Sequence, residues 1–321
     1  GAADGPEGSP GALTRVAVTG LKAWLECPFR FYLSRVLRLR AVDPAKTELD
    51  ALDFGTLCHA ALEAMGRETA LRDCTDAKTL GGFLLAALDR EVARRYGAEL
   101  VLPLIVQLES ARQRLGRAAE VQAQTRAEGW VIEAVEWKFV LDVGGLAVSG
   151  KNDRIDRQER TGEIRVLDYK TSDQPAQPRE AHLGAARRDE TAPEFARFTA
   201  DGRELVWRDL QLPLYLRALE ARRAEPGAPA APGATTSGRP VCAAGYFNLP
   251  KAATATAIAP WGGCATGEAE AAWHCAEGVA AAIRTGAFWP PNERIRADHD
   301  EFAALFHHGA AASVAWKAGP P

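Results

Sequence analysis

Cysteine is scarce in this sequence, and no two cysteines form a recognisable motif. Six cysteines stand among 321 residues, and none has the C-x-x-C spacing that is typical of zinc ribbons. This pattern also argues against the dense disulfide framework of a small secreted domain. The fold must therefore rest on an apolar core. A hydrophobic content of 47% supplies enough for one large domain or two smaller ones.

Long apolar runs are absent as well. No stretch of 18 apolar residues occurs, and the N-terminus lacks the charged and apolar segments of a secretory signal. We therefore expect a soluble cytoplasmic protein without membrane contact. Residues 1–12 are mostly Gly, Ala, Pro and acidic residues without periodicity, which predicts a disordered tail. The chain begins without methionine, which indicates a segment excised from a longer polypeptide.

The chain also has no excess of positive charge. Its net charge is −3, whereas proteins that contact DNA phosphates usually carry a basic surface. Lysine is rare, with eight residues against 31 arginines, so the lysine at position 170 is notable. The arginines can be solvated helix faces, or they can border an acidic centre that holds a metal ion. They cluster at positions 30, 35, 38 and 40 and in pairs at 187–188 and 222–223.

The most informative part of the chain is a predicted β-hairpin. Residues 146–156 have the character of a strand, and residues 157–163 are polar with a Thr-Gly pair at the turn. Residues 164–169 then return antiparallel to the first strand. This pairing brings Asp153 back towards Asp168.

Three side chains of this hairpin can perform phosphodiester chemistry. Because side chains two apart in a strand share a face, Asp168 and Lys170 lie side by side, and Tyr169 turns away. Two converging carboxylates, Asp153 and Asp168, repel each other unless a cation lies between them, and a few hard oxygen ligands suit Mg²⁺ or Mn²⁺. Lys170 can then orient or help deprotonate a water molecule and offset charge on the scissile phosphate. The alternative is an ordinary exposed hairpin with solvated charges.

Three further segments carry motifs in a defined order along the chain. Gln211 and Tyr215 are one helical turn apart, so they can present an amide and a phenol to the same groove. The segments are residues 21–33 (LKAWLECPFRFYL), residues 54–59 (FGTLCH) and residues 211–215 (QLPLY). Together with the hairpin, these motifs resemble the RecB-like branch of the PD-(D/E)XK nuclease superfamily, including its AddB-type members, over about residues 15–310.

The resemblance implies a metal site. Asp153 and Asp168 would bind the metal, with His59 and the backbone carbonyl of Tyr169 as further ligands. Glu136, on a strand expected over 131–141, matches an acidic position of the family. Considered alone, His59 can equally be a satisfied or exposed histidine, although a place in the first turns of a helix would favour anionic ligands. Glu136 can equally be a solvent-facing strand residue.

The resemblance also implies an activity. Lys170 would be the catalytic lysine, and Gln211 and Tyr215 would line the site near the DNA. The implied protein is a Mg²⁺- or Mn²⁺-dependent DNA nuclease that acts on strand ends or single strands in repair or recombination, with a helicase domain or subunit as a partner. Two alternatives stay open: a catalytically inactive nuclease-like module that binds DNA, and a protein-interaction module of a repair complex.

Cys27 bears on a second cofactor. Some AddB-type relatives hold an iron–sulfur cluster through the cysteine at this position and a C-terminal cysteine triplet. Residues from 286 onwards contain no cysteine, and a cluster needs about four thiolates. We therefore expect no iron–sulfur cluster and interpret Cys27 as a small buried residue before a helix-shaping proline.

The remaining patterns predict the organisation of the chain. Residues 173–203 mix prolines with charges, which predicts a mobile loop over the site, and residues 226–240 have the composition of a disordered insertion. Apolar spacing predicts helices at about 19–39, 55–68, 76–96, 103–127, 267–285 and 298–306, and a strand at 241–250.

These elements predict an α/β fold with a restriction-endonuclease-like mixed sheet and a helical N-terminal subdomain. We expect one nuclease domain over residues 13–321. Its helical part covers about 13–128 and its catalytic core covers about 129–321.

Overall fold

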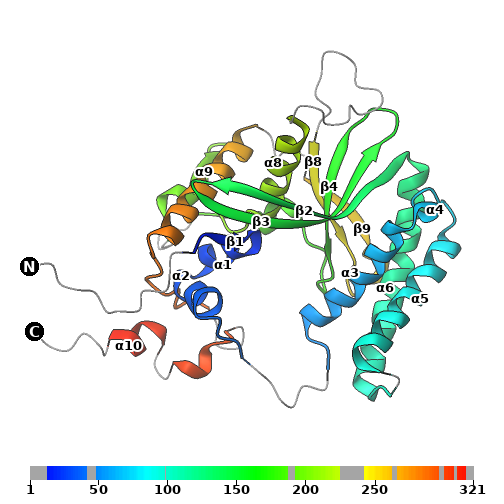
Figure 1. Ribbon diagram of the computed structural model, residues 1–321, viewed down its shortest axis with the longest axis horizontal. Coiled ribbons are helices and arrows are strands. Elements are labelled where there is room, and N and C mark those ends of the chain that lie inside the picture. Colours follow the sequence, from blue (N-terminus) through cyan, green and yellow to red (C-terminus); the bar gives the residue numbers. More distant parts are fainter. Residues whose placement is uncertain are drawn as a thin grey trace, which may run out of the picture.

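The computed structural model describes residues 13–41, 48–97, 99–186, 192–224, 242–261, 266–295, 300–306 and 309–315. A mixed six-stranded sheet lies at the centre of these residues, with helices packed on both of its faces (Figure 1). The predicted α/β class with a restriction-endonuclease-like mixed sheet is confirmed. The tail predicted at 1–12 and the insertion predicted at 226–240 lie outside the described residues.

The predicted hairpin forms the middle of the sheet. Its strands pair antiparallel, with Arg154 opposite Leu167 and Ile155 opposite Val166. Gly162 adopts a φ of 72° at the turn, a conformation that glycine takes without steric cost. The three consecutive antiparallel strands are β2 (Trp130–Val143), β3 (Leu146–Gln158) and β4 (Ile164–Lys170).

Three further strands complete the sheet. β8 (Cys242–Asn248), predicted over 241–250, runs parallel to β4. β9 (Ala257–Trp261) pairs antiparallel with β8, and β1 (Arg15–Ala17) pairs parallel with β3. The sequence did not reveal β1 and β9, because three and five residues are too short for a clear period of two. Since β1 belongs to the sheet, the helical part predicted over 13–128 includes one strand of the catalytic core.

One edge of β3 is divided between two partners. β1 pairs with residues 147–149 of β3, whereas β4 pairs with residues 154–157. Residues 150–153 therefore lie where the two partner strands diverge, and side chains from other elements can reach the backbone there. This gap in the ladder positions the candidate site.

Four helices form a second layer against the sheet. α5 and α6 match the predictions within one residue, and α3 begins at Ala51, because the Asp50 side chain accepts a hydrogen bond from the Asp53 N–H and caps the helix. Their apolar faces and the inner face of the sheet make one of two hydrophobic cores. The bounds are α3 (Ala51–Arg67), α4 (Thr69–Arg72), α5 (Ala77–Tyr96) and α6 (Leu102–Ala127).

The helix predicted over 19–39 is wrong as a continuous element. α1 (Val18–Glu26) ends at Cys27, whose backbone is extended, and α2 (Pro28–Phe31) begins with the proline. Proline has no backbone N–H to continue a helix but is well suited to start one. A π-helical turn, Tyr32–Val36, follows α2.

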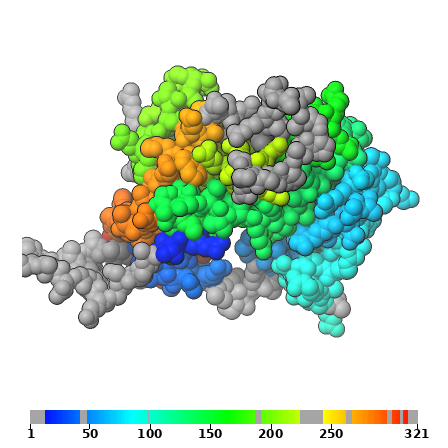
Figure 2. All heavy atoms as spheres, turned by 45° about the horizontal axis from the view of Figure 1, so that its top comes forward, coloured from blue at the N-terminus to red at the C-terminus, as the bar shows by residue number. Residues whose placement is uncertain are grey.

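Helices also cover the opposite face of the sheet. α8 (Gln211–Ala224) and α9 (Thr266–Arg284) pack there with α1 around the second core. In Figure 2, α9 (orange), the β2–β3 hairpin (green) and the N-terminal strand (blue) lie side by side on one surface, with the helical part (cyan) at one end. No described helix is long and apolar enough to cross a membrane.

The loop predicted over 173–203 is also wrong, because the described residues of that segment form regular elements. These residues form a helix and two strands, β5 and β6, which pair with β7, a strand that begins at the end of the segment, in a sheet of order β5-β7-β6. The buried Trp207 of β7 anchors this sheet. These strands have three to five residues, so prolines and charges obscured their alternation. The elements are α7 (Pro178–His182), β5 (Leu183–Ala185), a 3-10 turn (Glu194–Ala196), β6 (Arg197–Ala200) and β7 (Arg203–Trp207).

Short helical elements complete the description. Within residues 300–306, the helix predicted over 298–306 is only a 3-10 turn, Ala303–Leu305. Another 3-10 turn, Ala253–Ala255, lies between β8 and β9, and α10 (Ala310–Ala315) is the last described element.

Candidate active site

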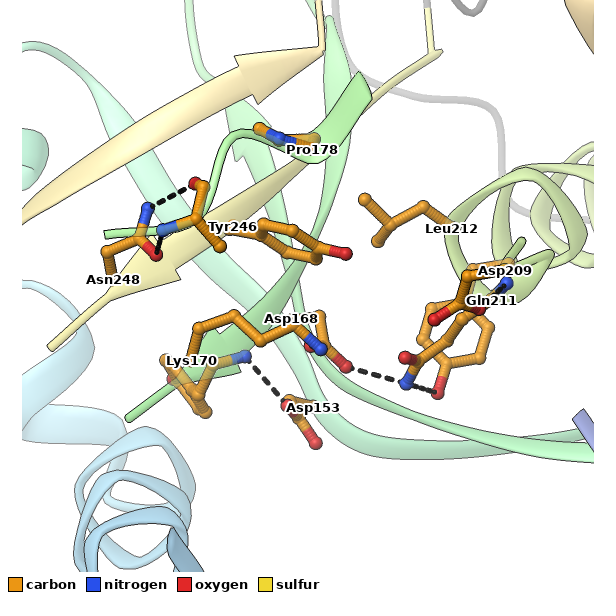
Figure 3. A network of polar contacts seen from close by, with 12 residues as sticks. Asp153, Asp168, Lys170, Pro178, Asp209, Gln211, Leu212, Tyr246 and Asn248 are labelled. Atoms are coloured by element: carbon orange, nitrogen blue, oxygen red, sulfur yellow. Dashed lines mark hydrogen bonds and ion pairs between the residues drawn. The ribbon is translucent and has the colours of Figure 1, made fainter. Parts of the chain in front are cut away.

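The site lies at the gap in the β3 edge, where β4 ends. Asp153 and Asp168 are both buried, with 7% and 4% exposure, although they are charged residues. The backbone N–H of Tyr169 donates a hydrogen bond of 2.8 Å to Asp153 Oδ2. This bond holds the Asp153 carboxylate beside the end of β4, as Figure 3 shows for Asp153, Asp168 and Lys170.

Lys170 and Asp168 share one face of β4, as their spacing predicts. Lys170 Nζ lies 2.6 Å from Asp168 Oδ2, and the lysine side chain is 28% exposed. The Tyr169 side chain turns to the other face, where it is buried in the core that the helical part forms with the sheet. The ammonium group is thus paired with a carboxylate and still reaches solvent.

A side chain of α8 binds the other oxygen of the Asp168 carboxylate. Gln211 Nε2 donates to Asp168 Oδ1 and to the Tyr215 hydroxyl, both at 2.8 Å. The Tyr215 hydroxyl in turn donates to the Lys151 carbonyl at 2.8 Å, within the gap of the β3 edge. Tyr215 is 3% exposed, so its phenol contacts protein, and its place near the DNA stays a prediction. Gln211 thus binds the Asp168 carboxylate, and Tyr215 binds Gln211 and the backbone of β3.

His59 lies between Asp153 of β3 and the end of β4. Its Nδ1 is 3.5 Å from Asp153 Oδ2, and its Nε2 is 3.2 Å from the Tyr169 carbonyl oxygen. Gly55 allows this approach, because a Cβ there would lie 3.1 Å from Thr171 Oγ1. His59 is the ninth residue of α3, so the expectation that it lies in the first turns of a helix is wrong. The N-terminal helix charge does not act on it.

Glu136 lines a cleft beside His59 and Lys170, and its side chain is largely buried. Its side chain is 10% exposed and forms an ion pair with Lys151. Glu136 has a φ of 54°, downstream of a register shift in β2, and this irregular backbone differs from the regular alternation assumed from the sequence. The cleft has a volume of about 910 Å³ and is lined by residues that include Glu136, His59, Lys170 and Glu63.

The electrostatics of the site follow from burial and from the nearness of the carboxylates. Burial raises the pKa of Asp168 to about 6, and the charge of Asp153 adds to this effect while Lys170 opposes it. Burial disfavours the charged form of His59, but the hydrogen bond to Asp153 and the charges of Asp153 and Asp168 outweigh it. They raise the pKa of His59 above its ordinary value. The negative charge of Asp153 and Asp168 is thus concentrated where the protein largely excludes water.

Comparison with known proteins identifies the family. A model of the PD-(D/E)XK nuclease superfamily matches residues 15–308. The chain belongs to this superfamily. It is also similar to a subunit of the ATP-dependent helicase/deoxyribonuclease of Pelotomaculum thermopropionicum, with 29% identity over 187 residues, which cover 49% of this chain. The matched part is 15% of that relative's length.

The residues present fit the divalent cation on which PD-(D/E)XK nucleases generally depend. Asp153, Asp168 and the Tyr169 carbonyl supply hard oxygen donors, and His59 supplies a nitrogen. Two buried carboxylates at one place are costly without a cation, as the raised pKa of Asp168 indicates. The described residues contain no preformed group of three His, Cys, Asp or Glu ligands. Gln211 and Lys170 occupy the two Asp168 oxygens.

The predicted arginine clusters do not all contribute to this site. Arg30 is turned inward, where it bonds to Asp300 Oδ2 at 2.5 Å and to the Asn292 carbonyl at 2.8 Å. The buried Cys27 thiol accepts hydrogen bonds from the backbone N–H groups of Arg30 and Asn292. Arg222 stacks on Trp137 at 5.3 Å, and the pair at 187–188 lies outside the described residues.

Arg114 is a site-supporting residue that the sequence did not single out. It lies on α6, is 5% exposed, and stacks over the Phe54 ring of α3 at 4.6 Å. Its Nη1 donates to the carbonyl oxygens of Thr171 at 2.7 Å and of Leu249 at 3.1 Å. Arg114 thereby ties the segment after Lys170 to the helical part. The sequence of α6 holds four arginines, at positions 112, 114, 117 and 126, and nothing in it distinguishes Arg114 from the other three.

A second polar network lies behind Lys170 and was also missed. His182 is fully buried and lies 3.1 Å from the Tyr246 hydroxyl, and its Nε2 accepts a hydrogen bond of 3.3 Å from the Leu212 N–H. Asp209 accepts a bond from the Gln211 N–H and pairs with Lys22 at 3.1 Å. These residues come from segments far apart in the sequence, so no local motif connects them.

His182 should make the stability of this PD-(D/E)XK protein pH-dependent. Burial lowers the pKa of His182 to about 4, whereas an unfolded histidine titrates near 6.5. Between these values the unfolded chain binds more protons, so stability is lost as the pH falls from about 6.5 to about 4. At pH 5 this amounts to about 2 kcal/mol. Urea unfolding of the wild type and of His182→Asn at pH 7 and pH 5 measures it. Between pH 7 and pH 5, the free energy of unfolding of the wild type should fall by about 2 kcal/mol more than that of the variant. Equal losses would contradict the prediction.

Proposed function

We propose that the protein is a divalent-metal-dependent DNA nuclease that hydrolyses phosphodiester bonds. The observation that carries this proposal is the convergence of Asp153, Asp168, Lys170 and His59 from three elements, where His59 and Lys170 line a cleft and the two aspartates lie buried beside them. Gln211 supports it, because this amide holds the buried Asp168 carboxylate in place. Such a set combines oxygen donors for a cation with a solvent-accessible ammonium group.

Each group has a definite task in this proposal. Asp153, Asp168, the Tyr169 carbonyl and His59 would hold Mg²⁺ or Mn²⁺, with Glu136 as a nearby acidic residue. The bound metal would supply an acidified water and neutralise charge on the phosphate. Lys170, held by Asp168, orients that water through an N–H donor and stabilises the negative charge that develops on phosphorus oxygens. Gln211, which also donates to the Tyr215 hydroxyl, keeps the Asp168 carboxylate in place beside Lys170.

We further propose that the substrate is the end of a DNA strand or a single strand in repair or recombination, with a helicase part or subunit as a partner. The Pelotomaculum relative is named as part of a helicase/deoxyribonuclease, which supports this context. The other candidate is a nuclease-like module that binds DNA without cutting it. The presence of both aspartates and the lysine favours the active enzyme.

A digestion experiment tests the proposal. Linear and closed circular DNA, each single- and double-stranded, are incubated with the protein in Mg²⁺, in Mn²⁺ and in excess EDTA. We expect cleavage in at least one metal and none in EDTA. Intact closed circles beside degraded linear DNA would assign an end-directed mode. DNA binding without cleavage under every metal condition would contradict the nuclease and support the binding module.

Gln211→Leu should weaken catalysis without unfolding the protein. The variant removes the amide that donates to Asp168 Oδ1, and a hydrogen bond to a charged group contributes about 1.5–3 kcal/mol. We expect kcat to fall roughly 10- to 100-fold with little change in KM. The matched control is Gln113→Leu, which removes an exposed amide of α6 that contacts Glu109. Equal kcat in the two variants would rule out the role of Gln211.

A further inference from the structure

Two contacts define the position of the Lys170 ammonium group. One is the ion pair of 2.6 Å with Asp168 Oδ2. The other is the face of an aromatic ring, since Nζ lies 4.6 Å from the centroid of Tyr246. A lysine has a flexible four-carbon stem, and an ion pair alone leaves its direction free. The ring face attracts the cation and closes one side of the space around it.

Tyr246 stands at the right place in the sheet for this contact. β8 runs parallel to β4 with Tyr246 opposite Asp168 and Asn248 opposite Lys170. Neighbouring residues in register point to the same face, so the Tyr246 ring lies beside the Asp168 and Lys170 side chains (Figure 3). Tyr246 is only 1% exposed, so its ring cannot swing into solvent.

His182 fixes the far end of the ring. Its Nε2 accepts from the Leu212 N–H, so the proton of the neutral ring is on Nδ1. Nδ1 lies 2.8 Å from the Pro178 carbonyl oxygen, to which it donates, and 3.1 Å from the Tyr246 hydroxyl oxygen. Leu212 belongs to the first turn of α8, next to Gln211. The helix that orients Asp168 therefore also orients His182.

We propose that Tyr246 is a positioning residue for Lys170, held by His182, an inference that rests on the proposed nuclease function. The ring face keeps the ammonium group beside Asp168 and directed into the cleft. His182 and the first turn of α8 keep the ring in place. The network joins α7, β8 and α8 to the catalytic end of β4. The hydrogen bonds of this network therefore position the Asp168 carboxylate and the Tyr246 ring, the two groups that flank Lys170.

An NMR measurement tests the position of the ammonium without any catalysis. The chain has eight lysines, so labelling every lysine with ¹³C at Cε gives a simple spectrum, and Lys170→Arg identifies the signal of Lys170. A methylene above an aromatic face is shifted upfield. We expect this shift to persist in Tyr246→Phe and to vanish in Tyr246→Leu, whereas the signal of the exposed Lys138 stays constant. An unshifted Lys170 signal in the wild type would overturn the proposal.

Kinetics of the same variants test the consequence. Tyr246→Leu should lower kcat roughly 10- to 100-fold with KM within about twofold, because misplacing a catalytic group by about 1 Å has effects of this size. Tyr246→Phe should retain activity within about threefold, since the ring remains. Equal losses of kcat in both variants, or losses that follow their melting temperatures, would contradict positioning by the ring. If the wild type does not cut DNA, the nuclease proposal fails, whereas the NMR result still decides whether Tyr246 positions Lys170.

Discussion

Replacing Lys170 with alanine should lower kcat for DNA cleavage by roughly 10²- to 10⁴-fold, the usual contribution of a positioned proton-transfer or charge-stabilising group. The ammonium is the positive side-chain group paired with Asp168, at 2.6 Å, and it reaches the cleft. Alanine removes both the N–H donor for the water and the positive charge near the phosphate. Steady-state cleavage of a fluorescent DNA in the metal that supports activity measures the effect.

Controls separate this loss from misfolding. Lys138→Ala removes an exposed lysine of β2 and should leave kcat unchanged. Asp168→Asn should be inactive as well, because a neutral amide lacks the negative charge with which a carboxylate binds a divalent cation. Asp201→Asn changes an acid that is 89% exposed in the turn between β6 and β7 and serves as its control. Wild-type activity in Lys170→Ala or Asp168→Asn, with native circular dichroism, would refute the assignment of the site.

Asp156→Ala should be the most destabilising change outside the catalytic groups. Arg154 and Asp156 are both 0% exposed, and Arg154 donates to Asp156 at 2.5 and 3.0 Å. Arg165 also pairs with this carboxylate, at 2.9 Å. Removing the carboxylate leaves a buried guanidinium without its counter-charge, which costs about 3–5 kcal/mol. Chemical denaturation should show this loss as a lower midpoint with an unchanged m-value.

The matched control for this prediction is Glu133→Ala. Glu133 pairs with Arg157 at 3.3 Å on the same sheet, but its side chain is 43% exposed. Surface pairs of this kind contribute about 0–1 kcal/mol. A loss in Asp156→Ala no larger than that in Glu133→Ala would show that the buried pair is tolerated without its acid.

The hairpin was predictable because its information is local. A period of two between residues 146 and 156, a Thr-Gly turn and a return strand are enough to place Asp153 near Asp168, and the register confirms the pairing of the two strands. The spacing of Asp168 and Lys170 likewise fixes one shared face. Helices α5 and α6 were predictable for the same reason, since their apolar spacing and their first turns are contained in the segment itself.

Other features depend on segments that meet only in the folded chain. Trp207 is buried because β5, β6 and β7 form a sheet, although 173–203 has the composition of a loop. His182 and Tyr246 are 64 residues apart, and Arg114 bonds to a carbonyl 135 residues away. Nothing in the sequence around any of them indicates these partners, because a hydrogen bond between distant segments leaves no periodic pattern.

The sequence by itself determined that a superfamily motif is present, with two aspartates and a lysine on one hairpin and a histidine and a glutamine in separate helices. Only the tertiary structure decided which groups touch. The short β1 pairs only with residues 147–149 of β3, and β4 pairs only with residues 154–157. The gap between them admits Tyr215 to the Lys151 carbonyl and Gln211 to Asp168. Side-chain spacing along a strand is set by local geometry, whereas hydrogen bonds between elements require that the chain has already packed its two cores.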